Sequence, residues 1–273
     1  MFMDSLQALI LGIVQGLTEF LPISSSGHLV IVPWLLGWPA PGLLFDTVLH
    51  LGTLVAVLLY FRSDIVSLLL SWVKSLTSRS LSDPLARLAW LIVVASVPAS
   101  LAGVLFKGIF ESAFSSPALA GTLLLCTAVI LVLAEEVARR RDRVVELGWW
   151  GAVAVGVAQA FAIFPGISRS GATIAVGLML GLKRAEAARF SFLLAVPVVL
   201  GAGGSQLLDL ARHPAPDGSA QPSLILLGFL AAAVSGYLAI GFLMRYLRSR
   251  SLYLFAGYTA LIGVLAISAA ITG

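Results

Sequence analysis

GIVQGLTEFLPISSSGHL at residues 12–29 and GVAQAFAIFPGISRSGAT at residues 156–173 repeat one pattern in two parts of the chain. The two stretches align without gaps, and seven of their 18 positions are identical. The identical pairs include polar residues and glycines, which a chance match of apolar helices would rarely supply: Gly12/Gly156, Gln15/Gln159, Phe20/Phe164, Ile23/Ile167, Ser24/Ser168, Ser26/Ser170 and Gly27/Gly171. We therefore expect one domain over 1–273, built from two related halves at about 1–134 and 145–273.

The composition around these stretches is that of a membrane protein. Of 273 residues 59% are apolar and 11% are charged, whereas an ordinary soluble domain has about 25% charged residues. This balance excludes a soluble enzyme, a disordered chain and a nucleic-acid binder. The net charge of +4 then reflects loops on one side of the membrane, where Lys and Arg accumulate.

Apolar runs alternate with short charged loops along the whole chain. A helix needs about 20 apolar residues to cross the hydrocarbon core, and runs of 10–14 are more often re-entrant. Six runs are long enough to cross: 44–61, 88–106, 118–134, 189–208, 223–247 and 252–271. The run at 148–164 is borderline. The runs at 28–37, 65–76 and 171–182 are too short.

The positive charges give these segments a direction. Four loops hold 14 of the 17 Lys and Arg residues: Arg62, Lys74, Arg79 and Arg87; Arg139, Arg140, Arg141 and Arg143; Lys183, Arg184 and Arg189; and Arg245, Arg248 and Arg250. Placing these loops in the cytoplasm gives a consistent alternation of six spans. The runs 148–164 and 171–182 must then enter and leave on the cytoplasmic side, and the runs 5–21 and 28–37 on the outer side.

The predicted fold is thus an all-α polytopic membrane protein. It has two repeats of opposite topology, about six spanning helices and two re-entrant hairpins. Interrupted helices of inverted repeats meet near the midplane and build polar sites there. A simpler alternative is that each break is only a Gly/Ser kink between packed helices.

Both breaks have the composition of an anion site. In each, a Ser-x-Ser-Gly sequence precedes a short apolar helix (Ser24–Gly27 and Ser168–Gly171). Serine is a favoured N-cap, and the free amides of a helix N-terminus attract phosphate. Arg169 adds a charge with forked donors, and an arginine at membrane depth is functional by default. The alternative for Arg169 is an ion pair with Glu19.

The first break also supplies residues for chemistry. Gln15 and Glu19 lie one helical turn apart, and their oxygens suit a hard cation such as Mg²⁺ or Ca²⁺. His28 can transfer protons near neutral pH, although a lone histidine at an interface is often inert. The spacing of Ser24, Ser25 and Ser26 does not distinguish capping, phosphate binding and nucleophilic attack.

Two further groups have weaker signals. Asp46 and His50 are four residues apart, which fits either outer-rim ligands or a structural pair at the interface. The cluster of Glu135, Glu136 and the arginines at 139–143 is typical of a solvated cytoplasmic loop.

QGLTEFLPISSSGHL (15–29) and PGISRSGATI (165–174) resemble the two signature motifs of the undecaprenyl-pyrophosphate phosphatase family, the bacitracin-resistance membrane enzymes. FDTVLHLGTLVAV (45–57) and FSFLLAVPV (190–198) are also similar to that family. The resemblance covers essentially the whole chain. It implies a helical inner-membrane protein of two inverted repeats that hydrolyses a polyprenyl pyrophosphate lipid to the monophosphate and inorganic phosphate. It also implies a divalent cation and a reaction at the outer face. We expect membrane lipids as partners and a homodimer as one oligomeric state.

The resemblance assigns roles residue by residue. Glu19 matches the second acidic residue of the family's acidic motif, Ser25 the proposed nucleophile, His28 the essential histidine and Arg169 the pyrophosphate-binding arginine. Gln15 stands where many members have glutamate, which leaves more of the metal binding to Glu19. The substrate-binding loops would contain Ser24, Ser26, Gly27, Gly166, Ser168, Ser170, Gly171 and Thr173.

The residues by themselves leave one competing class open. Inverted repeats with broken helices are also a transporter architecture. A flippase for a polyprenyl phosphate would need the same anion site, so only the product of the reaction separates the two classes.

Overall fold

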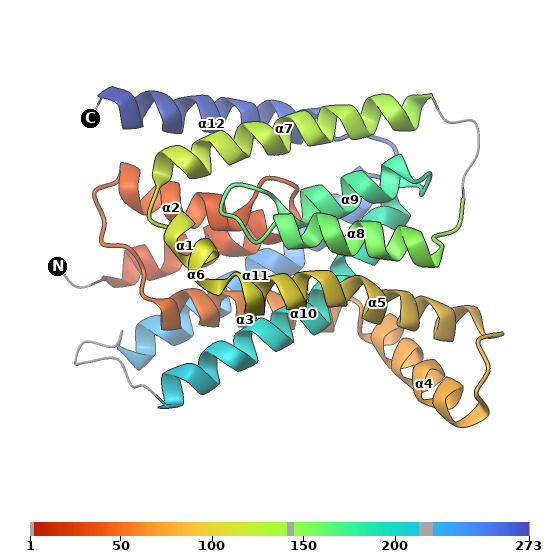
Figure 1. Ribbon diagram of the computed structural model, residues 1–273. Coiled ribbons are helices and arrows are strands. Elements are labelled where there is room, and N and C mark those ends of the chain that lie inside the picture. Colours follow the sequence, from red (N-terminus) through yellow and green to blue (C-terminus); the bar gives the residue numbers. More distant parts are fainter. Residues whose placement is uncertain (1–2, 141–144, 213–220, 273) are drawn as a thin grey trace.

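The computed structural model describes residues 3–140, 145–212 and 221–272, and these residues form helices and connecting loops without strands (Figure 1). In chain order the helices are α1 (Ser5–Phe20), α2 (Ser25–Leu35), α3 (Leu43–Tyr60), α4 (Arg62–Ser78), α5 (Pro84–Leu105), α6 (Lys107–Ala113), α7 (Pro117–Arg139), α8 (Trp149–Phe161), α9 (Arg169–Met179), α10 (Arg184–Arg212), α11 (Pro222–Tyr246) and α12 (Tyr253–Thr272). The all-helical prediction is confirmed.

The starts of several helices follow from local sequence. The Asp83 and Ser116 side chains accept hydrogen bonds from the amides of Leu85 and Leu119 at 2.9 and 3.2 Å. Each cap is followed by a proline, which lacks the amide that a helix start would leave unbonded. These caps begin α5 and α7, two of the long apolar helices.

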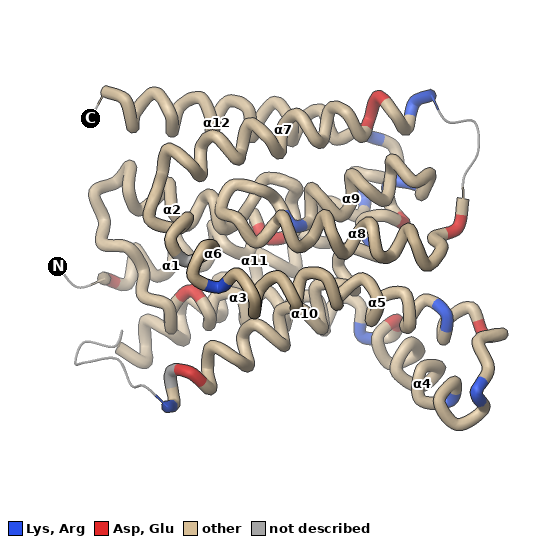
Figure 2. The backbone as a smooth tube through the Cα atoms, viewed as in Figure 1, with Lys and Arg blue, Asp and Glu red and all other residues tan. Residues whose placement is uncertain are grey.

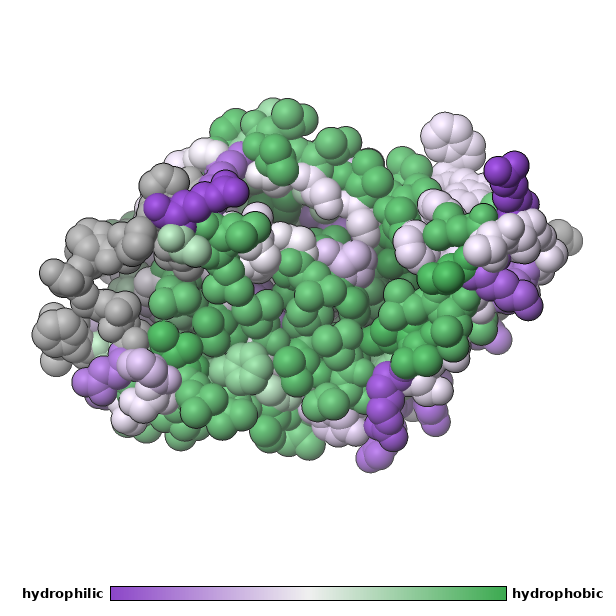
Figure 3. All heavy atoms as spheres, turned by 90° about the horizontal axis from the view of Figure 1, so that it is seen from below, coloured by the Kyte–Doolittle hydropathy of each residue, from purple (hydrophilic) through white to green (hydrophobic). Residues whose placement is uncertain are grey.

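Six helices are long and apolar enough to cross a membrane: α3, α5, α7, α10, α11 and α12. They coincide with the six runs that the sequence predicts as spans. The protein is therefore a multi-pass membrane protein. Figure 3 shows a broad hydrophobic face between more polar ends, as a surface in contact with lipid tails requires.

Two hairpins of short helices lie between the long ones. α1 and α2 have 16 and 11 residues, and α8 and α9 have 13 and 11, so none has the length to span a bilayer alone. In Figure 1 the turns of both hairpins lie near the middle of the molecule. The structure thus contains the two predicted hairpins. Their re-entrant entry into the membrane and the inverted repeat stay predictions.

The first helix of each hairpin packs against a long helix of the other half, α1 on α11 and α8 on α5. Equivalent glycines of the repeated pattern permit both contacts. A Cβ on Gly12 would lie 2.5 Å from the Gly228 carbonyl oxygen, and a Cβ on Gly156 would lie 2.5 Å from the Ala95 carbonyl oxygen. Only glycine allows backbones to approach so closely, which explains one identity between the two stretches.

Charged residues concentrate at the end of the molecule where α7 stops and α8 starts, as Figure 2 shows. A few lie at the opposite end, and a small group of red and blue segments lies near the middle. The distribution agrees with the loop charges in the sequence, and it singles out the few charges at the centre.

The expectation that Glu135 belongs to a solvated loop is wrong. α7 continues to Arg139, and the Glu135 side chain is completely buried. Its carboxylate accepts two hydrogen bonds from Arg184 and one from the Leu252 amide at 2.8 Å. Because Arg184 neutralises this charge and the amide begins α12, the acid ties together three helices. Glu136 remains partly exposed, Arg140 is exposed, and residues 141–143 lie outside the described residues.

We expect Glu135→Ala to lower the free energy of unfolding by about 3 kcal/mol, because it leaves Arg184 without its buried partner. The value lies at the low end for such a change since Arg184 is one-third exposed and can turn toward water. Thermal unfolding in detergent measures it. Glu136→Ala is the matched control and should have an effect below about 1 kcal/mol. Equal shifts for the two variants would contradict the assignment.

Candidate active site

The turns of the two hairpins touch each other. The Ser24 hydroxyl oxygen of the first turn accepts a hydrogen bond from the Gly166 amide of the second at 3.2 Å. In return, the Ser170 hydroxyl donates to the Leu21 carbonyl oxygen at 3.0 Å. The sequence predicts that the two breaks meet, and the structure confirms the contact.

Two helices begin at this contact, and each has the predicted serine cap. The Ser24 side chain accepts a hydrogen bond from the Gly27 amide at 3.3 Å, and the Ser168 side chain accepts one from the Gly171 amide at 3.0 Å. The N-termini of α2 and α9 therefore both lie at the meeting point of the hairpins. Their positive dipole ends favour an anion there.

Gly166 and Thr127 fix the second turn. Gly166 has φ +102°, and a Cβ on it would lie 2.3 Å from the Ala120 carbonyl oxygen of α7, so the position requires glycine. Thr127 donates to the Gly166 carbonyl oxygen at 2.8 Å and accepts from the Ser168 amide at 3.0 Å. Sequence reasoning missed Thr127, since a threonine within an apolar run carries no distinctive signal.

Glu19 is the centre of the polar network and is 7% exposed. One carboxylate oxygen accepts from an Arg169 guanidinium nitrogen at 3.0 Å. The other accepts from the Ser25 hydroxyl at 2.6 Å and from the Gln15 side-chain amide at 3.0 Å. The structure thus brings together four predicted site residues from α1, α2 and α9, and it contains the Glu19–Arg169 ion pair that the sequence leaves open.

One nitrogen of the Arg169 guanidinium has no partner among the described residues. One terminal nitrogen binds Glu19, and the other donates to the Ser191 carbonyl oxygen of α10 at 3.2 Å. The buried Nε has no hydrogen-bond partner within the described residues. A buried donor without a partner is unfavourable, so an anionic ligand that accepted from Nε would relieve this cost.

Thr173 lies one helical turn after Arg169 and hydrogen-bonds to the first turn of α9. Its hydroxyl donates to the Arg169 carbonyl oxygen at 2.7 Å and shares a hydrogen bond of 2.7 Å with the Ser191 hydroxyl. Ser191, another residue that sequence reasoning missed, therefore contacts Arg169 directly and through Thr173. Of the other predicted loop residues, Ser168 and Ser170 share a hydrogen bond of 3.2 Å, and Ser26 shares one of 3.3 Å with Ser24.

His28 lies apart from the Glu19 network. Its Nδ1 is 2.7 Å from the Ser24 carbonyl oxygen, and its Nε2 is 2.9 Å from the Tyr258 hydroxyl on α12. Among the described residues, no hydrogen bond joins His28 to Glu19 or Ser25. The expected role of His28 in proton transfer stays a prediction, and the group that accepts the Ser25 hydroxyl hydrogen bond is Glu19, at 2.6 Å.

His50 lies at the edge of the network. Its Nδ1 donates to the Asp46 carbonyl oxygen at 2.8 Å, and its Nε2 is 3.8 Å from a Glu19 oxygen. The two side chains of the expected pair therefore do not bind each other, since His50 uses the backbone of Asp46. The spacing in the sequence gave no indication that His50 faces Glu19.

A narrow cleft lies beside Glu19 and Arg169, and in this structure it has no room for a water molecule. Its remaining walls are contributed by α1, α3 and α10 and are almost entirely apolar: Phe20, Thr53, Leu54, Val57, Ala195 and Val199. The cleft thus joins a charged pair to apolar helix surfaces, but the helices would have to separate before it could hold a ligand.

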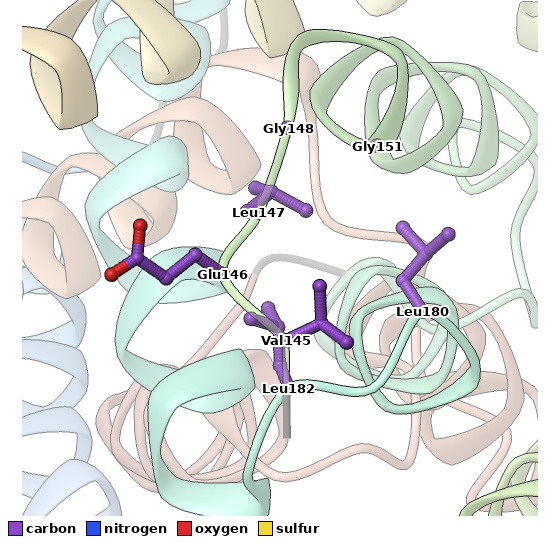
Figure 4. Close-up of a pocket in the computed structure, with 7 residues that line it drawn as sticks. All are labelled: Val145, Glu146, Leu147, Gly148, Gly151, Leu180 and Leu182. Carbon is purple, nitrogen blue, oxygen red and sulfur yellow. The ribbon is translucent and has the colours of Figure 1, made fainter. Parts of the chain in front are cut away.

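A second cavity, of about 150 Å³, lies between the segment before α8 and the end of α9. Figure 4 shows it lined mostly by leucine, valine and glycine, with the Glu146 carboxylate pointing away from the other labelled side chains. None of the predicted site residues lines this cavity. It offers no group for phosphate chemistry, so the meeting point of the hairpins is the candidate site.

Comparisons with known proteins find one matching family and similar enzymes from several organisms. The family model described as bacitracin resistance protein BacA matches residues 8–265. The chain is 44% identical over 272 residues to the undecaprenyl-diphosphatase of Pelobacter propionicus, covering 99% of both chains. It is 47% identical over 259 residues to that of Rubrobacter xylanophilus and 46% identical over 262 residues to that of Geobacter sulfurreducens, covering 94% and 96% of both chains.

Proposed function

This chain belongs to the BacA family of bacitracin resistance proteins, and from that membership we infer that it is an undecaprenyl-diphosphatase. It hydrolyses undecaprenyl pyrophosphate to undecaprenyl phosphate and inorganic phosphate. The observation that supports an assignment of this function to specific residues is the cluster around Glu19. In this cluster the Ser25 hydroxyl, the Glu19 carboxylate and the Arg169 guanidinium with its free Nε meet between two helix N-termini.

Binding of the substrate would use the polar turns of the hairpins for its pyrophosphate and the apolar cleft for its prenyl chain. The pyrophosphate would lie at the N-termini of α2 and α9 and accept a hydrogen bond from the free Nε of Arg169. The apolar cleft between α3 and α10, with Leu54 and Ala195 on its walls, would widen to take the start of a polyprenyl chain. The pyrophosphate would compete with Glu19 for Arg169 and so loosen the buried ion pair.

The chemical step would be an in-line displacement at the terminal phosphorus. The Ser25 oxygen forms a bond to phosphorus while the bond from phosphorus to the bridging oxygen breaks, and undecaprenyl phosphate leaves. The proton of Ser25 passes to Glu19, whose oxygen is 2.6 Å away. Water then attacks the phosphoserine: Glu19 returns its proton to the Ser25 oxygen as the bond from phosphorus to that oxygen breaks, and takes the proton that the water loses. That last proton leaves Glu19 with the inorganic phosphate. A direct attack by water held by Ser25 is the alternative.

Arg169 and the helix N-termini would stabilise the charge that develops on the phosphoryl oxygens in this step. The site excludes bulk water because Glu19, Ser25 and Arg169 are largely buried. In such surroundings each fixed donor is worth more than it is in water.

The residues present fit the expected divalent cation in part. The buried Oε1 of Gln15 has no hydrogen-bond partner, and it belongs to the side chain that binds Glu19. No group of three or more His, Cys, Asp or Glu side chains with metal-ligand spacing occurs in the described ranges. Glu19 and Gln15 would therefore hold Mg²⁺ or Ca²⁺ together with phosphate oxygens, as Mg²⁺ sites commonly do. The cation would supply further neutralisation of phosphoryl charge.

We place the enzyme in the bacterial cytoplasmic membrane, with the cation-rich end of Figure 2 inside. The hairpin of α1 and α2 would then enter from the outer side, and the site would open to the outer face. This orientation suits an enzyme that recycles a lipid carrier released outside the cell.

The experiment that tests the function is phosphate release by the purified protein in detergent micelles, where no gradient can exist. We expect inorganic phosphate and undecaprenyl phosphate in equal amounts. A protein that released none, but moved undecaprenyl phosphate across the bilayer of reconstituted vesicles, would instead be a flippase built on the same anion site.

A further inference from the structure

The ring of His28 is held on two sides by groups that the reaction above does not use. Its Nδ1 is 2.7 Å from the Ser24 carbonyl oxygen, and its Nε2 is 2.9 Å from the Tyr258 hydroxyl. The rings of His28 and Tyr258 are parallel within 6°, with centroids 5.6 Å apart. The side chain of His28 is buried, whereas Tyr258 is 39% exposed.

These partners determine the protonation of the ring. A carbonyl oxygen only accepts hydrogen bonds, so Nδ1 must carry the proton. Nε2 of the neutral ring is then an acceptor, and the Tyr258 hydroxyl is its donor. The hydrogen bond made by one ring nitrogen fixes the state of the other, and Tyr258 thus selects the tautomer that can hold Ser24.

Ser24 needs such support because its backbone is strained. It has φ +69°, a region that non-glycine residues adopt only where the surroundings enforce it. Its carbonyl oxygen accepts from the His28 backbone amide at 3.2 Å as well as from the ring. Its hydroxyl oxygen accepts from Gly27 and Gly166. Ser25, which follows directly, donates to Glu19.

We propose that Tyr258 is a positioning residue of this enzyme: its hydroxyl holds His28 in the tautomer that anchors the strained Ser24 backbone, and so keeps Ser25 against Glu19. The role rests on the proposed function. It connects α12, which otherwise packs along α7, to the turn between α1 and α2. His28 then acts on the reaction by holding the turn.

The first test is Tyr258→Phe, which keeps the ring and removes only the hydroxyl. We expect kcat to fall roughly tenfold, the equivalent of one hydrogen bond, with KM changed less than about twofold. Tyr237→Phe is the matched control: Tyr237 packs on Tyr60, and no hydrogen bond of its hydroxyl is found in the described part of the chain. An unchanged kcat in Tyr258→Phe would overturn the proposal.

A double-mutant cycle with His28→Asn separates positioning from a direct role of Tyr258. The Asn side-chain amide can replace the Nδ1 donor to Ser24 but offers nothing to the tyrosine. In the His28→Asn background we expect Tyr258→Phe to change kcat by less than about twofold. The same tenfold loss in both backgrounds would mean that Tyr258 acts independently of His28, and would overturn the proposal.

A spectroscopic measurement makes the test independent of activity. The chain has three histidines, so the ring nitrogens of selectively ¹⁵N-labelled protein can be resolved by NMR and those of His28 assigned with His28→Asn. We expect a protonated Nδ1 and a hydrogen-bonded, unprotonated Nε2 whose signal moves in Tyr258→Phe. Identical His28 signals in wild type and Tyr258→Phe would overturn the proposal. A wild-type protein that released no phosphate would contradict the function instead.

Discussion

Arg169→Ala is expected to reduce phosphate release from undecaprenyl pyrophosphate by about a thousandfold or more. Arginines that stabilise a transferring phosphoryl group contribute on the order of 10³–10⁵ to its rate. Arg169 is the one cation at the contact of the two hairpin turns in the described ranges, and its Nε is free to bind phosphate. The measurement is kcat/KM of the purified variant in detergent.

Two further variants make this result interpretable. Arg169→Lys keeps a positive charge next to Glu19, so the buried carboxylate keeps a partner, but the variant loses the forked donors. We expect its kcat/KM to fall by about a hundredfold. Arg189→Ala removes a cation near the start of α10 that pairs with Asp64 of α4 at 2.6 Å and belongs to a separate ion pair, and its kcat/KM should stay within about twofold. Near-normal turnover of a folded Arg169→Ala protein would refute the site.

The second large effect is expected for Ser25→Ala. If Ser25 is the nucleophile, its removal should lower kcat on the order of a thousandfold with little change in KM, since the hydroxyl bonds to phosphorus only during the reaction. Acid quenching of wild-type turnover should trap phosphoserine at position 25. Ser96→Ala is the matched control, because the one partner of its hydroxyl in the described part of the chain is the Ile92 carbonyl of its own helix.

The two chemical routes give different outcomes in this experiment. Direct attack by water predicts no trapped phosphoserine and a smaller loss in Ser25→Ala, because Glu19 would still accept the proton. Wild-type turnover in Ser25→Ala would contradict both routes, since each places Ser25 at the reacting phosphorus.

The spanning helices could be predicted because hydropathy is a local property of the chain. The apolar run at 118–134 lies within α7 (Pro117–Arg139), and the run at 189–208 lies within α10 (Arg184–Arg212). The residues at which these helices begin and end could not be predicted as well. Glu135 and Arg184 read separately as charged loop residues, yet they form an ion pair between α7 and α10 in which Glu135 is buried and Arg184 is one-third exposed.

The site divides in the same way. The contacts among Glu19, Ser25 and Arg169 could be expected because each residue lies in one of two repeated stretches, and interrupted helices of inverted repeats are predicted to meet. Tyr258 could not be predicted, because 230 positions separate it from His28 and no motif marks it. Thr127, Ser191 and His50 are likewise brought to the site only by the packing of α7, α10 and α3.

The most direct measurement is an experimental structure of the protein with a prenyl methylene-bisphosphonate, which the enzyme cannot cleave. We expect the bisphosphonate between the N-termini of α2 and α9, bound to Arg169 and within reach of the Ser25 oxygen, with the prenyl chain between α3 and α10. A bisphosphonate bound elsewhere, for example in the cavity beside Glu146, with Arg169 still paired only to Glu19, would contradict the assignment of the active site to the two hairpin turns.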